Sequence, residues 1–286
     1  MWERRYGVPV PVRLASGHRR YTTEQVILLR RVAEAMALGH RPGELLRTSP
    51  EELDALLQRE SRVERVPEEV ERWLELVRGS QPRELQAALQ TAAGELDPVT
   101  FLESRISPLL HAIGREWADG DVEIRHEHLA THAVEDFLRS QRVALSQRPE
   151  AGRRGLIVLA TLPGEQHALG LEMAAVLCES LGVRTWILGT DTPLAQIAAS
   201  VLESGARAVG VSVSLAAAGV QNDSVLAQLR DQLPEGTRLV VGGRSTRGKR
   251  RKLPGVAYCR DLEALRRWLE DEFPPRDEPA AGETPA

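Results

Sequence analysis

The hydrophobic period of the chain changes across the polar stretch 147–155, and this change constrains the fold more than any other feature. Before it, apolar residues recur three and four positions apart, as in Val70-Trp73-Leu74-Val77, a spacing typical of amphipathic helices. After it, short apolar runs alternate with helical stretches, which indicates a parallel sheet covered by helices. The sequence therefore predicts a helical unit followed by a doubly wound α/β unit.

Dipeptides that break helices divide the helical unit. They stand at Gly79-Ser80, Asp97-Pro98 and Asp119-Gly120, and each connection that they mark is short. Because short connections place consecutive helices antiparallel, we expect a four-helix bundle over residues 67–146. Ahead of it, Thr22 or Thr23 is expected to cap a helix that runs to about residue 38.

The α/β unit, of the Rossmann-like type, is expected to span residues 155–272. Its apolar runs predict parallel strands at 156–160, 184–188, 208–213, 239–241 and 256–258. A final helix is predicted over 261–272, and residues 273–286, acidic and rich in proline, are expected to form a disordered tail. Sheets of this kind bind ligands at the carboxyl ends of their strands.

The composition suits a soluble, helix-rich protein, with 42% apolar and 4% aromatic residues. No run approaches the roughly 18 to 20 apolar residues that span a bilayer, and the N-terminus lacks an apolar signal segment. We therefore expect a cytoplasmic protein without a membrane partner. Cys178 and Cys259 lie far apart in apolar stretches, which favours reduced, structural thiols over a metal site or redox pair.

The formal net charge of −4 is unevenly distributed. Residues 1–31 contain seven arginines against Glu3 and Glu24, whereas the last residues of the chain are acidic. A basic head on an acidic body favours a polyanion as the partner of the head.

Residues of the α/β unit that could bind or accommodate a ligand lie at the predicted strand ends. Glu165-x-His167-x-x-Gly170 follows the first strand, Ser212-x-Ser214 the third, and Gly242-Gly243 the fourth. An imidazole in such a loop can reach a metal, while a carboxylate two residues earlier fixes its tautomer. The glycines allow close approach of a helix or of a buried group.

This pattern resembles the cobalamin-binding module in which a histidine of the protein replaces the cofactor's own base on cobalt. The resemblance covers nearly all of 155–272 and implies that the dimethylbenzimidazole tail enters a slot between sheet and helices. It implies His167 as the cobalt ligand and further cofactor contacts from Glu165, Gly170, Ser212, Ser214, Gly242 and Gly243. Glu165 stands for the family's aspartate, and Ser214 for the leucine of its Ser-x-Leu element.

A competing motif, Gly243-x-x-x-x-Gly248-Lys249, is superficially similar to a phosphate-binding loop. Arg250 stands where that loop needs Ser or Thr to bind magnesium, so we reject this interpretation. The basic residues 247–252 are interpreted as a solvated loop.

In the helical unit, Trp117 is followed after nine residues by Glu127-His128. This element resembles the Trp-x(9)-Glu-His element of light-sensing, cobalamin-dependent transcription factors of the MerR superfamily, the CarH and CarA type. The resemblance implies that Trp117 packs on the upper-face adenosyl group of adenosylcobalamin and that the Glu-His pair surrounds it, with Glu127 contacting the ribose. The ordinary alternative for Trp117 is a bundle-core aromatic residue.

Ala118 departs from this family, whose light-sensing members have a histidine there that can ligate the upper face after photolysis. The nearby candidates for that role are His111, His126, His128 and His132. His128 and His132 share a helix face at a spacing compatible with zinc, but no further ligand cluster accompanies them, which disfavours zinc.

The tract from Trp2 to Tyr21 interleaves arginines with aromatic residues around glycine turns. It resembles the recognition-helix end and wing of a MerR-type winged helix, expected within residues 1–60. The resemblance implies DNA contacts from Arg4, Arg5, Arg13, His18, Arg19, Arg20 and Tyr21, with arginines clamping phosphates. Because Met1 falls inside the recognition element, we expect a partial winged helix, from a misplaced start codon or in a shortened relative that depends on assembly.

These features predict a cobalamin-binding transcriptional regulator rather than an enzyme. Adenosylcobalamin is expected between bundle and sheet, where it promotes self-association into a homo-oligomer that represses by binding DNA; light would cleave the cobalt–carbon bond and loosen the assembly. Two alternatives stay open: a cobalamin sensor that ignores light, which Ala118 favours, and a corrinoid methyl-carrier protein of a methyltransferase system.

Overall fold

The computed structural model describes residues 3, 6–14, 16–37, 40, 42–61, 66–147, 149, 153–214, 220–243, 246 and 253–275. The chain divides into two compact units: Met1–Phe137 form most of the first, and the second begins at Leu138. Nowhere in these residues is a helix both long enough and apolar enough to cross a membrane. The predicted DNA contacts Arg4 and Arg5, the basic loop 247–252 and residues 276–286 of the predicted tail lie outside the described residues.

A small antiparallel hairpin lies near the start of the first unit. Strand β1 (Val12–Arg13) pairs with β2 (Arg19–Arg20), at the position where the sequence predicts a wing. The carboxylate of Glu3 lies 3.0 Å from Arg13 Nη2 and 3.7 Å from Arg19 Nε. The remainder of the winged helix stays a prediction.

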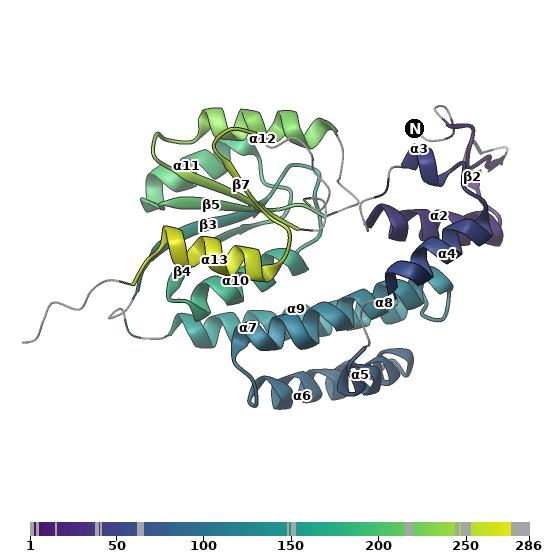
Figure 1. The fold of residues 1–286 in the computed structure, drawn as a ribbon, viewed down its shortest axis with the longest axis horizontal. Coiled ribbons are helices and arrows are strands. Elements are labelled where there is room, and N and C mark those ends of the chain that lie inside the picture. The colour runs from purple at the N-terminus through teal and green to yellow at the C-terminus, as the bar shows by residue number, and fades with distance from the viewer. Residues whose placement is uncertain are drawn as a thin grey trace, which may run out of the picture. The chain divides into compact units, whose positions relative to one another are not determined.

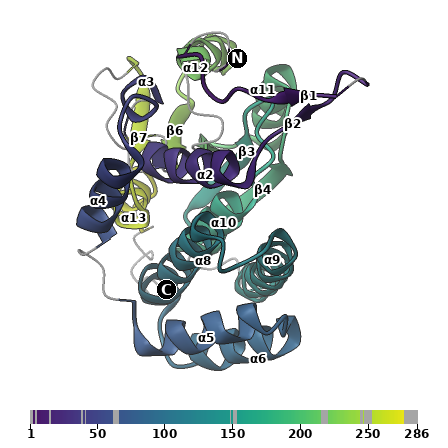
Figure 2. The same cartoon turned by 90° about the vertical axis from the view of Figure 1, so that its right-hand side faces the viewer.

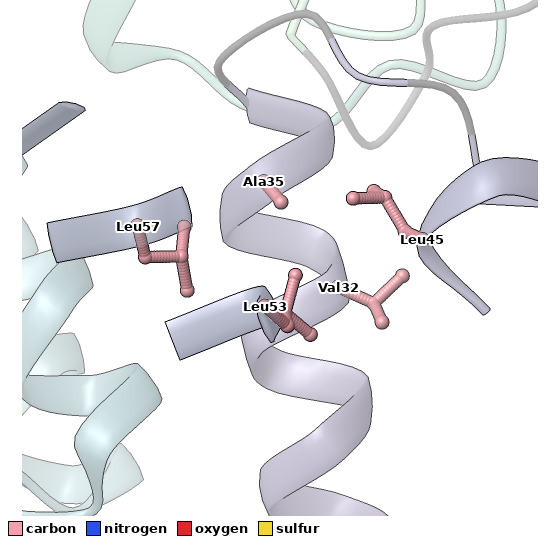
Figure 3. Close-up of a cluster of buried hydrophobic side chains, with 5 residues drawn as sticks. All are labelled: Val32, Ala35, Leu45, Leu53 and Leu57. Atoms are coloured by element: carbon pink, nitrogen blue, oxygen red, sulfur yellow. The ribbon is translucent and has the colours of Figure 1, made fainter. Parts of the chain in front are cut away.

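Three helices follow the hairpin: α2 (Thr23–Ala37), α3 (Pro42–Leu45) and α4 (Pro50–Ser61). Their apolar faces meet in one small core, and Figure 3 shows these side chains directed toward one another: Val32, Ala35, Leu45, Leu53 and Leu57. Burial of these side chains holds the three short helices together.

Reciprocal side-chain caps begin two of these helices. Ahead of α2, Thr22 Oγ1 accepts a hydrogen bond from Gln25 N at 3.2 Å, and Gln25 Oε1 accepts one from Thr22 N at 3.0 Å. Ser49 and Glu52 repeat the arrangement ahead of α4, at 3.2 and 3.1 Å. Each pair satisfies backbone donors that the first helical turn cannot, which confirms the predicted cap at Thr22.

The bundle helices begin and end at the predicted breaks. They are α5 (Glu68–Arg78), α6 (Pro82–Ala93), a composite helix that ends as α8 (Ser107–Asp119), and α9 (Ile124–Ser146). Helix α5 packs against both α6 and α8 (Figure 1). Phe101 lies at the centre of an aromatic group, 6.5 Å from Trp73 and 5.4 Å from Phe137 between ring centroids.

The composite helix contains a π-helical turn that its apolar spacing does not predict. After α7 (Pro98–Phe101), the turn η1 covers Leu102–Ile106 and leads into α8. Pro108 has no N–H to donate to the carbonyl of Ser104, and its ring opposes that carbonyl, so a regular α-helix is disfavoured there. The Ser104 carbonyl instead accepts a hydrogen bond from Arg105 Nη1 at 3.1 Å.

The described part of the second unit contains a five-stranded parallel sheet in the order β4-β3-β5-β6-β7. The strands are β3 (Gly155–Thr161), β4 (Val183–Gly189), β5 (Ala208–Ser212), β6 (Arg238–Gly242) and β7 (Val256–Cys259). Each lies within two residues of its predicted position, and the predicted parallel sheet is confirmed.

Helices cover both faces of this sheet. Helices α11 (Leu194–Ser204) and α12 (Val220–Gln232) pack together on one face, and α10 (Leu169–Ser180) and α13 (Leu262–Glu272) on the other (Figures 1 and 2). The sheet is therefore doubly wound, as predicted.

Buried ion pairs anchor the α/β unit. Glu179 on α10 is 2% exposed and accepts from Arg153 Nη1 at 2.7 Å. Its other oxygen accepts from the backbone N and the hydroxyl of Thr185 on β4, both at 2.8 Å. Because each carboxylate oxygen has a donor, the buried charge of Glu179 is compensated.

Phe273 corrects the predicted start of the tail. Its side chain is fully buried and meets Trp268 edge to face at 6.4 Å. A Cβ on Gly155 would lie 2.9 Å from its ring, so the ring fits closely against the start of β3. Burial of the aromatic ring stabilises Phe273 in the fold, although the residues that follow it are polar and rich in proline.

Both cysteines are free and buried. Burial raises the pKa of the Cys178 thiol far above its usual range, with a smaller contribution from the neighbouring charge of Glu179. Such a thiol is a poor nucleophile and a poor metal ligand, in keeping with the structural role predicted for it.

Replacing Glu179 with alanine is expected to lower the free energy of unfolding by about 3–5 kcal/mol, because it leaves the buried Arg153 guanidinium without its carboxylate. Urea denaturation followed by circular dichroism measures the change. The matched control is Glu203→Ala on the exposed surface of α11, expected to change stability by less than about 0.5 kcal/mol. Equal losses in both variants would contradict the assignment.

Candidate functional site

The carboxyl ends of three neighbouring strands meet in register. Thr161 ends β3 and pairs with Ser212, which ends β5, and Ser212 in turn pairs with Gly242, which ends β6. Since β4 lies on the opposite side of β3, the chain reverses its strand order between β3 and β5. This switch point is where doubly wound sheets bind their ligands.

Glu165 and His167 form a hydrogen-bonded pair in the loop between β3 and α10. Glu165 is 2% exposed, and its Oε1 lies 2.5 Å from His167 Nδ1 and accepts from His167 N at 2.9 Å. The His167 side chain is 64% exposed. With Nδ1 engaged by the carboxylate, Nε2 is the nitrogen that this histidine can offer to a metal.

A second set of contacts fixes this loop, and sequence analysis missed both residues that make it. Asp191, just after β4, accepts from Gly164 N at 2.7 Å and from Gln166 Nε2 at 3.2 Å. Thr161 Oγ1 donates to the Glu165 carbonyl at 2.7 Å and accepts from Asp191 N at 2.9 Å. The signal that was available is the position of both polar residues at strand ends that the sequence already predicted.

Two glycines are required by close packing. A Cβ on Gly170, in the first turn of α10, would lie 2.8 Å from Ser212 Oγ. Gly243 has φ +106°, and a Cβ there would lie 2.3 Å from the Val213 carbonyl oxygen. No other residue fits either position without a shift of the backbone or of its neighbour.

Gly242 differs from these two because a Cβ built on it would have no heavy atom of the described residues within 4 Å. The space lies at the carboxyl end of β6, the same edge of the sheet as the His167 loop. Ser214 follows two residues after β5 and is partly buried. Room for a group at the same sheet edge as an oriented and exposed imidazole is compatible with a cofactor whose metal takes a histidine ligand.

The first unit contains the other predicted cofactor residues. Trp117 lies in the last turn of α8 and is partly exposed, in contrast to the buried Trp73. Glu127 and His128 lie in the first turns of α9, where Glu127 Oε1 accepts from Thr131 Oγ1 at 2.8 Å. His128 Nε2 lies 3.7 Å from the other Glu127 oxygen.

The histidines near this element have separate surroundings. His126 is buried, and its Nδ1 accepts from Glu123 N at 3.1 Å, whereas the side chains of His128 and His132 are 62% and 74% exposed. His111 is partly buried in α8. Among the residues for which positions are given, no three His, Cys, Asp or Glu side chains are grouped as metal ligands, so nothing here favours zinc.

Two segments of the chain match known families. Residues 155–264 match the family described as B12 binding domain, and residues 69–139 match a second family of the same description. Cobalamin is therefore the cofactor, as predicted, and the matches include the α/β residues and the Trp-x(9)-Glu-His element described above.

Two relatives in Myxococcus xanthus are similar over most of their length. The HTH-type transcriptional repressor CarH is 30% identical over 254 residues, which are 86% of this chain and 83% of the relative. The HTH-type transcriptional repressor CarA is 30% identical over 273 residues, 92% of this chain and 88% of the relative.

Among solved structures, the monomethylamine corrinoid protein of Methanosarcina barkeri has a TM-score of 0.55 at 15% sequence identity. The similarity covers 70% of this chain and 96% of that chain. At this identity it supports the fold alone, a helical bundle joined to a doubly wound sheet.

The contact between Gly170 and Ser212 gives a test of the packing at this edge. Gly170→Ala is expected to destabilise the protein relative to the same substitution made in a Ser212→Ala background, where the opposing oxygen is absent. In that background the gain in helix propensity, about 1 kcal/mol, is no longer offset. Thermal unfolding of the four proteins measures the difference, and additive effects would show that the approach is not close.

Proposed function

The chain belongs to the family of the HTH-type transcriptional repressors CarH and CarA, and from this membership we propose that it is a light-responsive repressor controlled by adenosylcobalamin. The observation that carries the proposal is the hydrogen bond between buried Glu165 and exposed His167 at the switch point of the sheet. The two relatives are transcriptional repressors rather than enzymes, and no catalytic residue is assigned.

In this proposal His167 holds the lower face of the cofactor through Nε2. Glu165 accepts a hydrogen bond from Nδ1, which fixes the tautomer and orients the ring. Thr161 and Asp191 hold the loop, so the imidazole is positioned before the cofactor arrives. Gly170, Ser212, Ser214, Gly242 and Gly243 form the surroundings of the cofactor at the strand ends.

Trp117 and the Glu127-His128 pair are proposed to cover the upper face. The partly exposed indole offers an apolar surface to the adenosyl group, and Glu127 offers a carboxylate oxygen to a ribose hydroxyl. When bound, the cofactor supplies a cobalt–carbon bond that light can cleave. The protein contributes packing that depends on the adenosyl group. The states with and without this group therefore differ in their contacts.

DNA is the partner of the basic head, in agreement with the helix-turn-helix repressors that the chain resembles. Exposed residues of the hairpin are proposed to contact the duplex: Arg13, His18, Arg19, Arg20 and Tyr21. Contacts between arginines and phosphates are strongly weakened by salt. Several copies acting together would compensate for a weak single head, which is why we propose a homo-oligomer as the repressing form.

His167→Ala is expected to weaken cobalamin binding and to change the visible spectrum of the bound cofactor, because the lower ligand is removed. Titration with hydroxocobalamin in darkness, followed by absorbance, measures both. Glu165→Gln keeps the volume of the side chain but loses the charge, and is expected to weaken affinity about 10- to 100-fold. His18→Ala, which changes an exposed histidine outside the proposed cofactor site, is the control; an unchanged spectrum in His167→Ala would refute cobalt ligation.

Light sensitivity is tested by the size of the adenosylcobalamin complex in solution. We expect an oligomer in darkness and a smaller species after illumination, measured by light scattering on a sizing column. Trp117→Ala is expected to bind cobalamin but to assemble less in darkness, because the upper-face packing is lost. An oligomer that persists unchanged in light would favour the light-insensitive sensor, the alternative that Ala118 raises.

The second candidate function is a corrinoid methyl carrier. The observation that favours it is the sequence similarity to the dimethylamine corrinoid protein 1 of Methanosarcina acetivorans, which is 23% identical over 158 residues, 55% of this chain. A partner methyltransferase that removes the methyl group from bound methylcobalamin would support this function over repression.

A further inference from the structure

Arg30 on α2 makes two contacts with the tryptophan of the B12-binding bundle. Its Nη1 donates to the Trp117 carbonyl at 3.0 Å, and its guanidinium carbon lies 4.5 Å from the centre of the indole ring. Both residues belong to the first unit, in which α2 packs directly against α8. Thus the helix that follows the wing touches the residue proposed to cover the cofactor.

The chemistry of this contact is specific to arginine. Trp117 lies in the last turn of α8, where backbone carbonyls lack partners within the helix and carry partial negative charge. A guanidinium can satisfy such a carbonyl and at the same time lie flat over an indole ring. Arg30 Nε is buried and has no hydrogen-bond partner among the described residues.

We propose that Arg30 is a positioning residue that couples the cofactor site to the DNA-binding head. Its guanidinium occupies one side of the Trp117 ring and holds the indole so that the other side meets the cofactor. A shift of Trp117 on binding or loss of the adenosyl group then moves Arg30, and with it α2, which begins three residues after the hairpin. This inference rests on the proposed packing of Trp117 against adenosylcobalamin.

The coupling can be measured without DNA by hydrogen–deuterium exchange of the full chain, with and without adenosylcobalamin in darkness. In the wild type, the cofactor is expected to slow amide exchange in the last turn of α8 and in α2. A slowing of about 5-fold or more corresponds to the usual size of allosteric coupling. In Arg30→Met, which keeps an unbranched apolar stem, we expect the slowing in α8 to persist and that in α2 to disappear.

The matched control is Arg31→Met. Arg31 is the next residue of α2, but its partner is Asp54 on α4, at 2.6 Å. The Arg31→Met variant is expected to keep the slowing of amide exchange in α2 that the wild type shows. Arg30→Lys keeps the charge without the flat group and is expected to give a reduced response, so it serves as the second variant if Arg30→Met does not fold.

The outcomes separate the inference from the proposed function. An α2 response that survives in Arg30→Met, or that is lost equally in Arg31→Met, would overturn the coupling while leaving cobalamin control intact. A wild-type protein that binds adenosylcobalamin yet shows no change in α8 would overturn the proposed role of Trp117, and with it the premise of the coupling.

Discussion

The hydrogen bond from His167 Nδ1 to the buried carboxylate of Glu165 is the contact on which the cofactor site depends. It leaves Nε2 for the proposed bond to cobalt, and it places a negative charge where water has little access, so the imidazole is oriented strongly. Thr161 and Asp191 support the loop from two strands, and Gly170 lets α10 begin close to Ser212. Residues at the ends of three strands, β3, β4 and β5, therefore contribute to holding the His167 loop and the start of α10 in place.

The sequence was sufficient for the strands, the helix breaks and the residues at the strand ends, because each depends on local spacing and on the rule that parallel strands share a carboxyl edge. Contacts between segments far apart in the chain were not predictable. Asp191 lies just beyond the end of the second strand, which marks it as a residue of the ligand edge, but its sequence neighbours do not specify that it bonds the loop after the first strand. Phe273 was assigned to the tail because its neighbours are polar, but its ring is buried and packs closely against Gly155.

Hydrophobic spacing also does not predict features that depend on the chemistry of a single residue. The apolar spacing across Leu102–Ile106 suits an ordinary helix, and only the missing N–H of Pro108 explains the wider turn observed there. Arg30 is one of seven arginines in residues 1–31, whose combined charge predicted a polyanion as the partner of the head. Its contacts with Trp117 assign it to the interior of the first unit instead, so the charge of the head overstates what is free to meet a duplex.

The carboxylate of Glu3 adds to that difference. It already neutralises part of the charge of Arg13 and Arg19, so an approaching phosphate competes with an anion held within the same chain. A phosphate that binds only one of these arginines replaces the Glu3 carboxylate with another anion, so little binding free energy is gained. In the proposed complex with DNA, a duplex that engages both guanidinium groups at once would displace this exposed carboxylate more readily than a phosphate that meets only one of them.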